Sequence, residues 1–448
     1  MELDYLDIAT EEQTSWPGDT ADITFIYEPD FGILGPSAFE SISNRWLERA
    51  RAADAQTVTL DFRAVLYFDI ATVINISILL NSICKEYKYI YMRLPDSESV
   101  LYFLCTMNFH GAVANACSKK FSRLLSPHDI LRYNQIFTRL GIHVKIIGNR
   151  ATTDLDVLNR KGYFAIKCFD LDPQVAHDSQ LIIDFSLNEA QYWQNFEIQY
   201  VLNKHLMQVG QNQIANDIFY ECITNALRHP GCSKMQIASR FVRAERIRMQ
   251  LLNLHGQREE QLAKTEGFRR INNVFQIVVW DNGANILQTL KQGFDKNGGL
   301  RMREHRASLR TFKVKVSKAS NKRTPSGPIR VQSDVLPDNS GHFEEWHWIL
   351  ASFFPGVTAD LQKPIVGKGA TLFTAQYIFG GGMGLTNLLD TVVRDLGGRL
   401  VLRTHDYRFI FNNGTDGYNS FDVEIKGKTS DGFFKGNMIV ATLPVKEY

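Results

Sequence analysis

The apolar and polar positions in about the first 110 residues follow two alternating periods. Residues 23–29 alternate apolar and polar side chains and end at a proline, which is typical of a strand. Residues 36–53 place apolar side chains at helical spacing after a Pro-Ser start. The same criteria predict further strands at 57–62 and 88–95, and further helices at 70–87 and 97–109. Strands and helices in alternation predict a small α/β layer.

The pattern weakens between residues 116 and 190. The short apolar runs 144–148 and 180–185 are interpreted as strands joined by polar connections. We therefore expect 116–190 to form a connector subdomain.

Clear elements return in the last part of the chain. The segment "ECITNALRHP" (221–230) has the pattern of a helix, and 274–281 is an apolar strand that runs into the turn "DNGAN". A glycine run within 380–398 leads into a helix, and 436–444 is a closing strand. Taken with the N-terminal layer, these elements predict a mixed α/β (α+β) fold class.

Composition narrows the class of protein. The chain has 448 residues, 44% of them hydrophobic and 22% charged, as in soluble globular proteins of two or three domains. It has no run of about 18 apolar residues, and its acidic start "MELDYLDIATEEQ" is unlike a signal peptide. The six cysteines show no CxxC spacing and are expected to be buried free thiols. These features predict a cytoplasmic protein without a membrane segment.

Charge is distributed unevenly although the formal net charge is only +2. Residues 1–60 contain 12 acids and 3 arginines, a net of −9, whereas residues 291–330 contain 12 Lys/Arg and 2 acids, a net of +10. We expect the basic stretch to be a mobile, solvated loop that becomes ordered on an anion. That anion would be the acidic N-terminal segment of this or a second chain, or a nucleic-acid backbone.

The helix at 221–230 carries two polar groups on one face. Glu221 and Asn225 are four residues apart, so their side chains point the same way. An amide oxygen such as that of Asn225 is a suitable ligand for Mg²⁺. A carboxylate one turn away can position a water molecule for attack on a phosphate.

The turn after the strand 274–281 and the later glycine run add groups that suit a nucleotide. The carboxylate of Asp281 can accept a hydrogen bond from the exocyclic amine of adenine, and Gly283 allows close approach of the backbone. Gly382 and Gly384 leave backbone N–H groups free for phosphate at the start of a helix.

In this order, the four motifs resemble the N, G1 and G2 boxes and the last strand of the GHKL ATPases. The sequence E-x-x-T-N-A is most similar to the anti-sigma-factor kinase branch. The resemblance covers about 195–445 and implies a Bergerat α/β sandwich over 191–448. Within that domain, insertions are expected at about 243–268 and 287–379, the second forming a long lid.

The resemblance implies ATP and Mg²⁺ as cofactors. It makes Glu221 the catalytic residue and Asn225 the Mg²⁺ ligand. The residues expected to bind the nucleotide are Asn225, Asp281, Gly283, Asn285, Gly382, Met383, Gly384, Leu385 and Asn437. Two of these depart from the family pattern. Asn285 replaces a glycine and is expected to tolerate a left-handed backbone, and Asn437 replaces a threonine.

The N-terminal elements resemble a STAS domain over 1–115, carried by "TLDFRAVLYFDIAT" (59–72). Family members that are phosphorylated have serine directly after the loop aspartate. Here Ile70 follows Asp69, and Thr72 is the nearest hydroxyl. The resemblance therefore implies a docking or dimerising module, with a second copy or another protein as partner.

Three functions remain open at this point. The chain could be an ATP-hydrolysing conformational switch, a protein Ser/Thr kinase of the anti-sigma type, or a nucleotide-gated module that binds nucleic acid through 291–330. The STAS-like domain without its acceptor serine favours the switch over the kinase. The pathway cannot be deduced from the residues.

Overall fold

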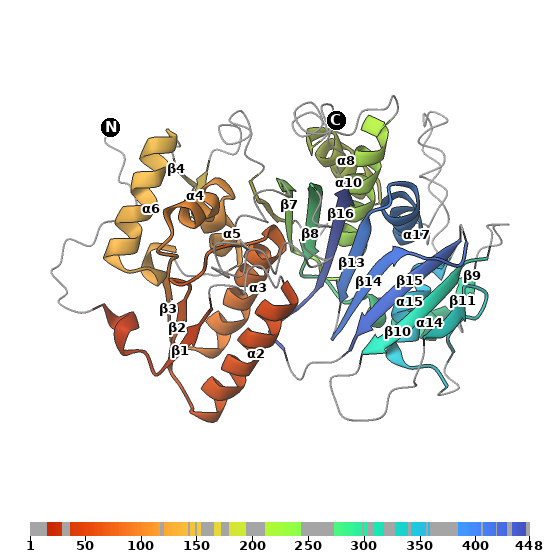
Figure 1. Ribbon diagram of the computed structural model, residues 1–448, viewed down its shortest axis with the longest axis horizontal. Coiled ribbons are helices and arrows are strands. Elements are labelled where there is room, and N and C mark those ends of the chain that lie inside the picture. Colours follow the sequence, from red (N-terminus) through yellow and green to blue (C-terminus); the bar gives the residue numbers. More distant parts are fainter. Residues whose placement is uncertain are drawn as a thin grey trace, which may run out of the picture. The chain divides into compact units, whose positions relative to one another are not determined.

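The computed structural model describes residues 16–28, 36–116, 121–141, 144–147, 150–153, 165–171, 179–193, 211–242, 273–297, 300–302, 309–317, 328–338, 342–354, 357–358, 384–404, 406–417, 419–427 and 432–444. The chain divides into two compact units (Figure 1). The first comprises 1–169, 236–273 and 430–434, and the second comprises 170–235, 274–429 and 435–448. The strands β6 (Lys167–Asp170) and β7 (Lys234–Val242) contain points at which the chain passes from one unit to the other.

The first unit contains a parallel sheet of three strands in the order β1-β2-β3. Its strands are β1 (Ile23–Ile26), β2 (Thr57–Asp61) and β3 (Tyr89–Arg93). Its helices are α2 (Pro36–Ala52), α3 (Ile70–Glu86), α4 (Glu98–Thr106), α5 (Phe109–Ala116) and α6 (Pro127–Leu140), with 3-10 turns η1 (Pro17–Thr20) and η2 (Phe121–Leu124) and a hairpin of β4 (Val144–Ile147) and β5 (Arg150–Thr153). The alternation predicted for this part of the chain is confirmed.

Two helix boundaries in this unit have clear local causes. Asp69 caps α3: its carboxylate accepts hydrogen bonds from the backbone N–H and the hydroxyl of Thr72 at 2.9 and 2.7 Å. Thr72 is completely buried. The single helix expected at 97–109 ends at Thr106 instead, because Asn108 adopts a left-handed φ of 58° and α5 begins after it.

The second unit is built on a mixed sheet, and its strands run in the order β11-β10-β15-β14-β13-β16-β8. The strands β10 and β15 are parallel, and the other neighbours are antiparallel. Their bounds are β8 (Val274–Asp281), β10 (Thr311–Ser317), β11 (Ile329–Gln332), β13 (Arg399–Thr404), β14 (Tyr407–Asn413), β15 (Ser420–Lys426) and β16 (Asn437–Pro444), and a separate pair is formed by β9 (Arg301–Met302) and β12 (Val357–Thr358). The strands predicted at 274–281 and 436–444 are thus hydrogen-bonded neighbours.

The helices of this unit include the predicted segment 221–230, which ends the longer helix α10. The helices are α8 (Ser179–Trp193), α10 (Gln211–Arg228), α14 (Ile286–Asn297), α15 (Glu345–Ala351) and α17 (Gly384–Leu389), and α17 continues into the π-helical turn η6 (Asp390–Asp395). The structure confirms a mixed α/β class. The helix after the glycine run is also confirmed, although it is short.

The strand expected at 180–185 is wrong, because these residues lie in α8. Ile182, Ser186 and Ala190 are buried, and their spacing of four residues marks one face of a helix. A short apolar run fits either element, and here neither Gly nor Pro interrupts the chain up to Trp193, so the helix continues.

The expectation of a mobile loop is wrong for the described part of the basic stretch. Residues 311–317 form β10 inside the sheet, with Phe312 and Val314 fully buried. Alternating apolar and cationic side chains let this strand bury one face although it carries positive charge. Two parts of the basic stretch lie outside the described residues, namely 303–308 and 318–327. The whole of the first insertion, 243–268, also lies outside them.

Two further observations concern the predicted compartment. Within the described residues, no helix is long and apolar enough to cross a membrane. Cys84 is disulfide-bonded, so the expectation of free thiols is wrong for this residue. Cys105, Cys222 and Cys232 are buried free cysteines, as expected.

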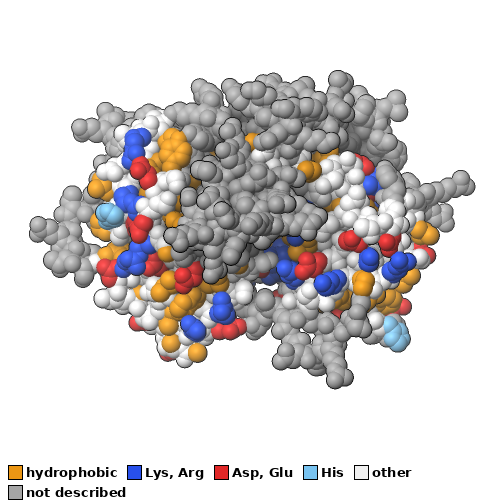
Figure 2. All heavy atoms as spheres, in the orientation of Figure 1, with side chains coloured by type: hydrophobic (Ala, Val, Ile, Leu, Met, Phe, Trp, Pro, Cys, Tyr) orange, Lys and Arg blue, Asp and Glu red, His pale blue; other side chains and the backbone are white. Residues whose placement is uncertain are grey.

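On the face drawn in Figure 2, cationic and anionic side chains of the described residues are interspersed.

Candidate functional site

The helix α10 brings the predicted carboxylate and amide to the glycine that begins α17. A Cβ atom placed on Gly384 would lie 2.6 Å from Oε2 of Glu221 and 3.1 Å from Oδ1 of Asn225. A side chain at position 384 would have to displace the end of the Glu221 side chain, whereas glycine fits there without rearrangement. Residues 221 and 225 thus meet residue 384 in space.

The polar groups at this contact are largely shielded from solvent. Glu221 is 8% exposed, and Nδ2 of Asn387 donates to its Oε1 at 3.4 Å. The Nδ2 group of Asn225 is buried and has no hydrogen-bond acceptor among the described residues. A buried amide without an acceptor is costly, so this group suits a ligand that supplies one.

A second cluster forms around Asp281, at the end of β8. Its side chain is 4% exposed, and its Oδ1 accepts the backbone N–H of Gly283 at 2.9 Å. Gly283 has little free space, because a Cβ atom there would lie 2.7 Å from Cβ of His229. The close approach expected of this glycine is therefore made to His229, the residue that follows α10.

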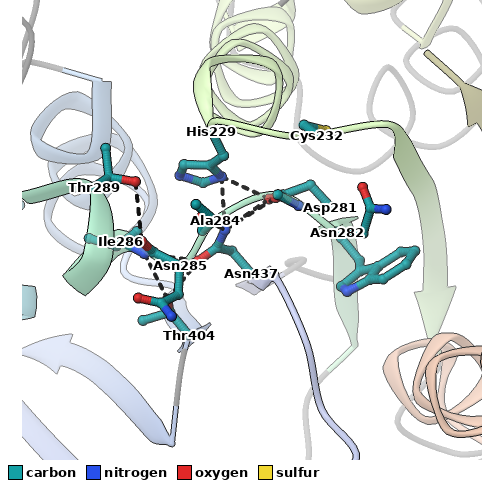
Figure 3. Close-up of polar contacts among 12 residues, drawn as sticks. His229, Cys232, Asp281, Asn282, Ala284, Asn285, Ile286, Thr289, Thr404 and Asn437 are labelled. Atoms are coloured by element: carbon teal, nitrogen blue, oxygen red, sulfur yellow. Dashed lines mark hydrogen bonds and ion pairs between the residues drawn. The ribbon is translucent and has the colours of Figure 1, made fainter. Parts of the chain in front are cut away.

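Asn437, the first residue of β16, has an amide whose orientation is fixed on both sides. Its Oδ1 accepts hydrogen bonds from the hydroxyl of Thr404 at 2.6 Å and from the backbone N–H of Ile286 at 3.3 Å. Its Nδ2 donates to the backbone carbonyl of Ala284 at 3.0 Å and to Oδ1 of Asp281 at 3.1 Å (Figure 3). Asn437 thereby ties the predicted base-binding carboxylate to the turn that follows it.

His229 completes this cluster. Its Nδ1 lies 3.0 Å from Oδ2 of Asp281 and 2.9 Å from Nδ2 of Asn437, and its side chain is 11% exposed (Figure 3). The helix ends here because Pro230 follows and Gly231 has a φ of 74°. Local sequence therefore fixes the end of the helix at His229, and the packing of the chain brings this residue beside Asp281.

Backbone contacts hold the turn after β8 against the segment after α10. The N–H of Ala284 donates to the carbonyl of Pro230 at 2.7 Å. The Oδ1 of Asn282 accepts the N–H groups of Ser233 and Lys234 at 2.9 and 2.8 Å. The turn is thus a fixed wall of the cluster rather than a free loop.

Four of the predicted nucleotide-binding residues either have another environment than expected or lie outside the described part. Asn285 does not have a left-handed backbone; it caps α14, with Oδ1 accepting the N–H of Gln288 at 2.8 Å. Leu385 is buried. Gly382 and Met383 lie outside the described residues.

The 287–379 insertion contacts the helix that follows the glycine run. The guanidinium of Arg310 donates to Oδ2 of Asp390 and lies 5.9 Å from the ring of Phe421. The hydroxyl of Thr386 donates to the carbonyls of Phe353 and Phe354 at 3.2 and 3.3 Å. Burial lowers the pKa of Arg310 and raises the pKa of Asp390. The insertion is therefore joined to η6 by a buried ion pair and to α17 by the hydrogen bonds of Thr386.

The residues around Asn225 fit a magnesium–nucleotide complex chemically. Mg²⁺ takes oxygen ligands and commonly uses only one or two from the protein, with phosphates and water supplying the others. Asn225 and Glu221 offer such oxygens, and a phosphate oxygen would give the buried Nδ2 its acceptor. The described residues hold no group of three His, Cys, Asp or Glu that could bind a metal alone.

Three contributors to these clusters were not expected as site residues. His229 follows Asn225 by four residues and comes directly after α10, but its contact with Asp281 joins residues 52 apart. Thr404 contacts Asn437, 33 residues away, and Arg310 contacts Asp390, 80 residues away. The spacing of His229 from Asn225 was a usable signal, whereas the contacts of the other two depend on strand pairing and packing.

No protein-family model, curated protein or solved structure matches this chain.

Proposed function

We propose that the chain is an ATP-binding protein of the GHKL class and that it works as an ATP-hydrolysing conformational switch. The observation that supports the proposal is the meeting of separate motifs along one helix. Glu221 and Asn225 of α10 lie against Gly384, and one turn later His229 lies against Asp281. Each motif alone is common in proteins, but their convergence is what a site for one extended ligand requires.

Each side chain then has a chemical role. Asp281 would accept a hydrogen bond from the exocyclic amine of adenine, and the amide oxygen of Asn225 would be a ligand of Mg²⁺. A metal held there would supply positive charge to the phosphates. Glu221 accepts a proton from the attacking water, for which its position one turn from Asn225 on the same helix face is suitable.

The insertion supplies a route from the nucleotide to the rest of the second unit. Arg310 and the carbonyls of Phe353 and Phe354 hold α17 and η6, and Gly384 begins α17. A phosphate that displaces Gly384 from Glu221 and Asn225 would move the insertion with it. This arrangement favours a switch over a site that only binds.

The first unit would serve as the docking or dimerising module. The hydroxyl of Thr72, the nearest one to the position of the family serine, is completely buried and donates to Asp69. A buried, hydrogen-bonded hydroxyl is not accessible to a kinase for phosphorylation. Light scattering of the purified chain with and without Mg-ATP measures whether it self-associates.

The test of the function is the fate of labelled phosphate. Purified protein is incubated with γ-labelled ATP and Mg²⁺, and free phosphate, labelled protein and bound nucleotide are measured together. A switch releases phosphate without labelling protein, whereas a kinase labels an added partner. Binding without turnover, combined with salt-sensitive DNA or RNA binding, would support the nucleic-acid module. Absence of ATP binding would refute the proposal.

A further inference from the structure

We propose that His229 is a gate on the base site. Its imidazole occupies the carboxylate oxygen of Asp281 to which a nucleobase amine would donate a hydrogen bond. The inference rests on the proposed function, because it concerns how the same site admits and selects its base. It assigns a specificity role to a residue that closes a helix and lies outside the predicted set of binding residues.

The proton on His229 can be assigned from its neighbours. The two N–H groups of Asn437 are used by the carbonyl of Ala284 and by Oδ1 of Asp281, at 3.0 and 3.1 Å. Asn437 cannot be turned over, because its Oδ1 accepts from Thr404 and Ile286. Nδ1 of His229 lies 2.9 Å from Nδ2 of Asn437 and 3.0 Å from Oδ2 of Asp281. A bare lone pair on Nδ1 would face the carboxylate oxygen and would also compete with Ala284 and Asp281 for the two amide hydrogens of Asn437. We therefore assign the hydrogen to Nδ1, which donates it to Oδ2 of Asp281.

The acceptors of Asp281 are then almost all in use. A carboxylate offers about four lone-pair positions. Oδ1 accepts from Gly283 and Asn437, and Oδ2 accepts from His229. Because the side chain of Asp281 is only 4% exposed, a base cannot reach Oδ2 from solvent while His229 remains in place.

His229 is the movable part of this arrangement. Gly283 and Asn437 are held by backbone groups of the turn and by β13 and β16, whereas the imidazole is attached through rotatable side-chain bonds at the end of a helix. A base amine that binds Oδ2 therefore replaces the hydrogen bond from His229. The exchange favours bases with an amine at this edge and disfavours those with a carbonyl, because a carbonyl cannot donate to a carboxylate.

Removal of the imidazole should tighten binding of an amino base. In the unmodified chain, the base has to break the hydrogen bond from His229 to the charged Asp281. Without that bond to break, the affinity for the base should rise roughly tenfold. We expect His229→Ala to bind a non-hydrolysable ATP analogue about tenfold more tightly than the unmodified chain. The corresponding inosine analogue, which has a carbonyl in place of the amine, should gain much less.

The experiment is isothermal titration of the full chain with both analogues in the presence of Mg²⁺. His128→Ala, a change at an exposed histidine of the first unit, is the matched control and should leave both affinities unchanged. Circular dichroism checks that each variant is folded. If the alanine variant is unfolded, His229→Leu fills part of the space beside Gly283 without a donor and carries the same expectation.

The outcomes separate the two proposals. Tighter binding of the adenine analogue alone supports the gate, and so does binding that appears only in the His229 variant. Equal or weaker adenine binding, or an equal gain for both analogues, overturns the gate while ATP binding stands. If no variant binds either analogue, the ATP-binding function itself is wrong and the gate falls with it.

Discussion

The ion pair between Arg310 and Asp390 gives a quantitative test of how the insertion is attached. Arg310 is 5% exposed, and the side chain of Asp390 is 16% exposed. Asp390 has a second cationic partner, Arg394, at 3.1 Å. Within the described residues, the guanidinium of Arg310 has one other hydrogen bond besides that to Asp390. It is a long one, 3.5 Å to the carbonyl of Thr386. The two partners therefore depend on each other unequally.

This inequality predicts that substitutions of the two partners lower the free energy of unfolding by different amounts. Asp390→Leu leaves a buried guanidinium without a counter-charge, which costs about 3–5 kcal/mol of unfolding free energy. Arg310→Met keeps most of the side-chain volume and leaves Asp390 paired with Arg394. Its cost is the lost cation–π contact with Phe421 and one charged hydrogen bond, about 1–2 kcal/mol. The double variant should be more stable than Asp390→Leu alone, because the unpaired charge is gone.

The assay is urea denaturation followed by tryptophan fluorescence and by far-ultraviolet circular dichroism. Two probes are needed because the chain has two compact units, which can unfold separately. Arg330→Met is a matched control, since the side chain of Arg330 is 68% exposed although it contacts Asp416. It should change stability by less than about 0.5 kcal/mol. Equal costs for Asp390→Leu and Arg310→Met, or a double variant less stable than Asp390→Leu, would refute the reasoning.

Three further predictions follow from single residues. Asn225→Ala should abolish Mg²⁺-dependent ATP binding in isothermal titration, and unchanged affinity would remove Asn225 from the site. Glu221→Ala should bind ATP but release phosphate roughly 10²–10⁴-fold more slowly, as for loss of a general base; unchanged turnover would make this carboxylate structural. Burial lowers the pKa of His110 to about 3. Because the unfolded chain takes up this proton near pH 6.5, its contribution to stability is full above that pH and is lost as the pH falls toward 3. The loss between pH 7 and pH 5 is about 2 kcal/mol, and thermal or urea unfolding of His110→Phe should lack that component.

The sequence alone determined the elements whose signals are local. Strands such as 57–62 and the helix that carries Glu221 and Asn225 were predictable, because alternation and helical spacing act within a few residues. The face shared by Glu221 and Asn225 also follows from helix geometry alone. The ambiguous run at 180–185 shows the limit, since a short apolar segment is compatible with either element and only packing decides.

Only the tertiary structure decided which distant groups meet. The sequence could not place β10 inside the sheet, because its positive charge hides the alternation of Phe312 and Val314, and its pairing with β15 joins segments about a hundred residues apart. It could not show that Arg310 is buried against Asp390 or that His229 occupies Oδ2 of Asp281. A side chain's partner is fixed by the path of the whole backbone, and residue type and spacing state only which partners it would accept.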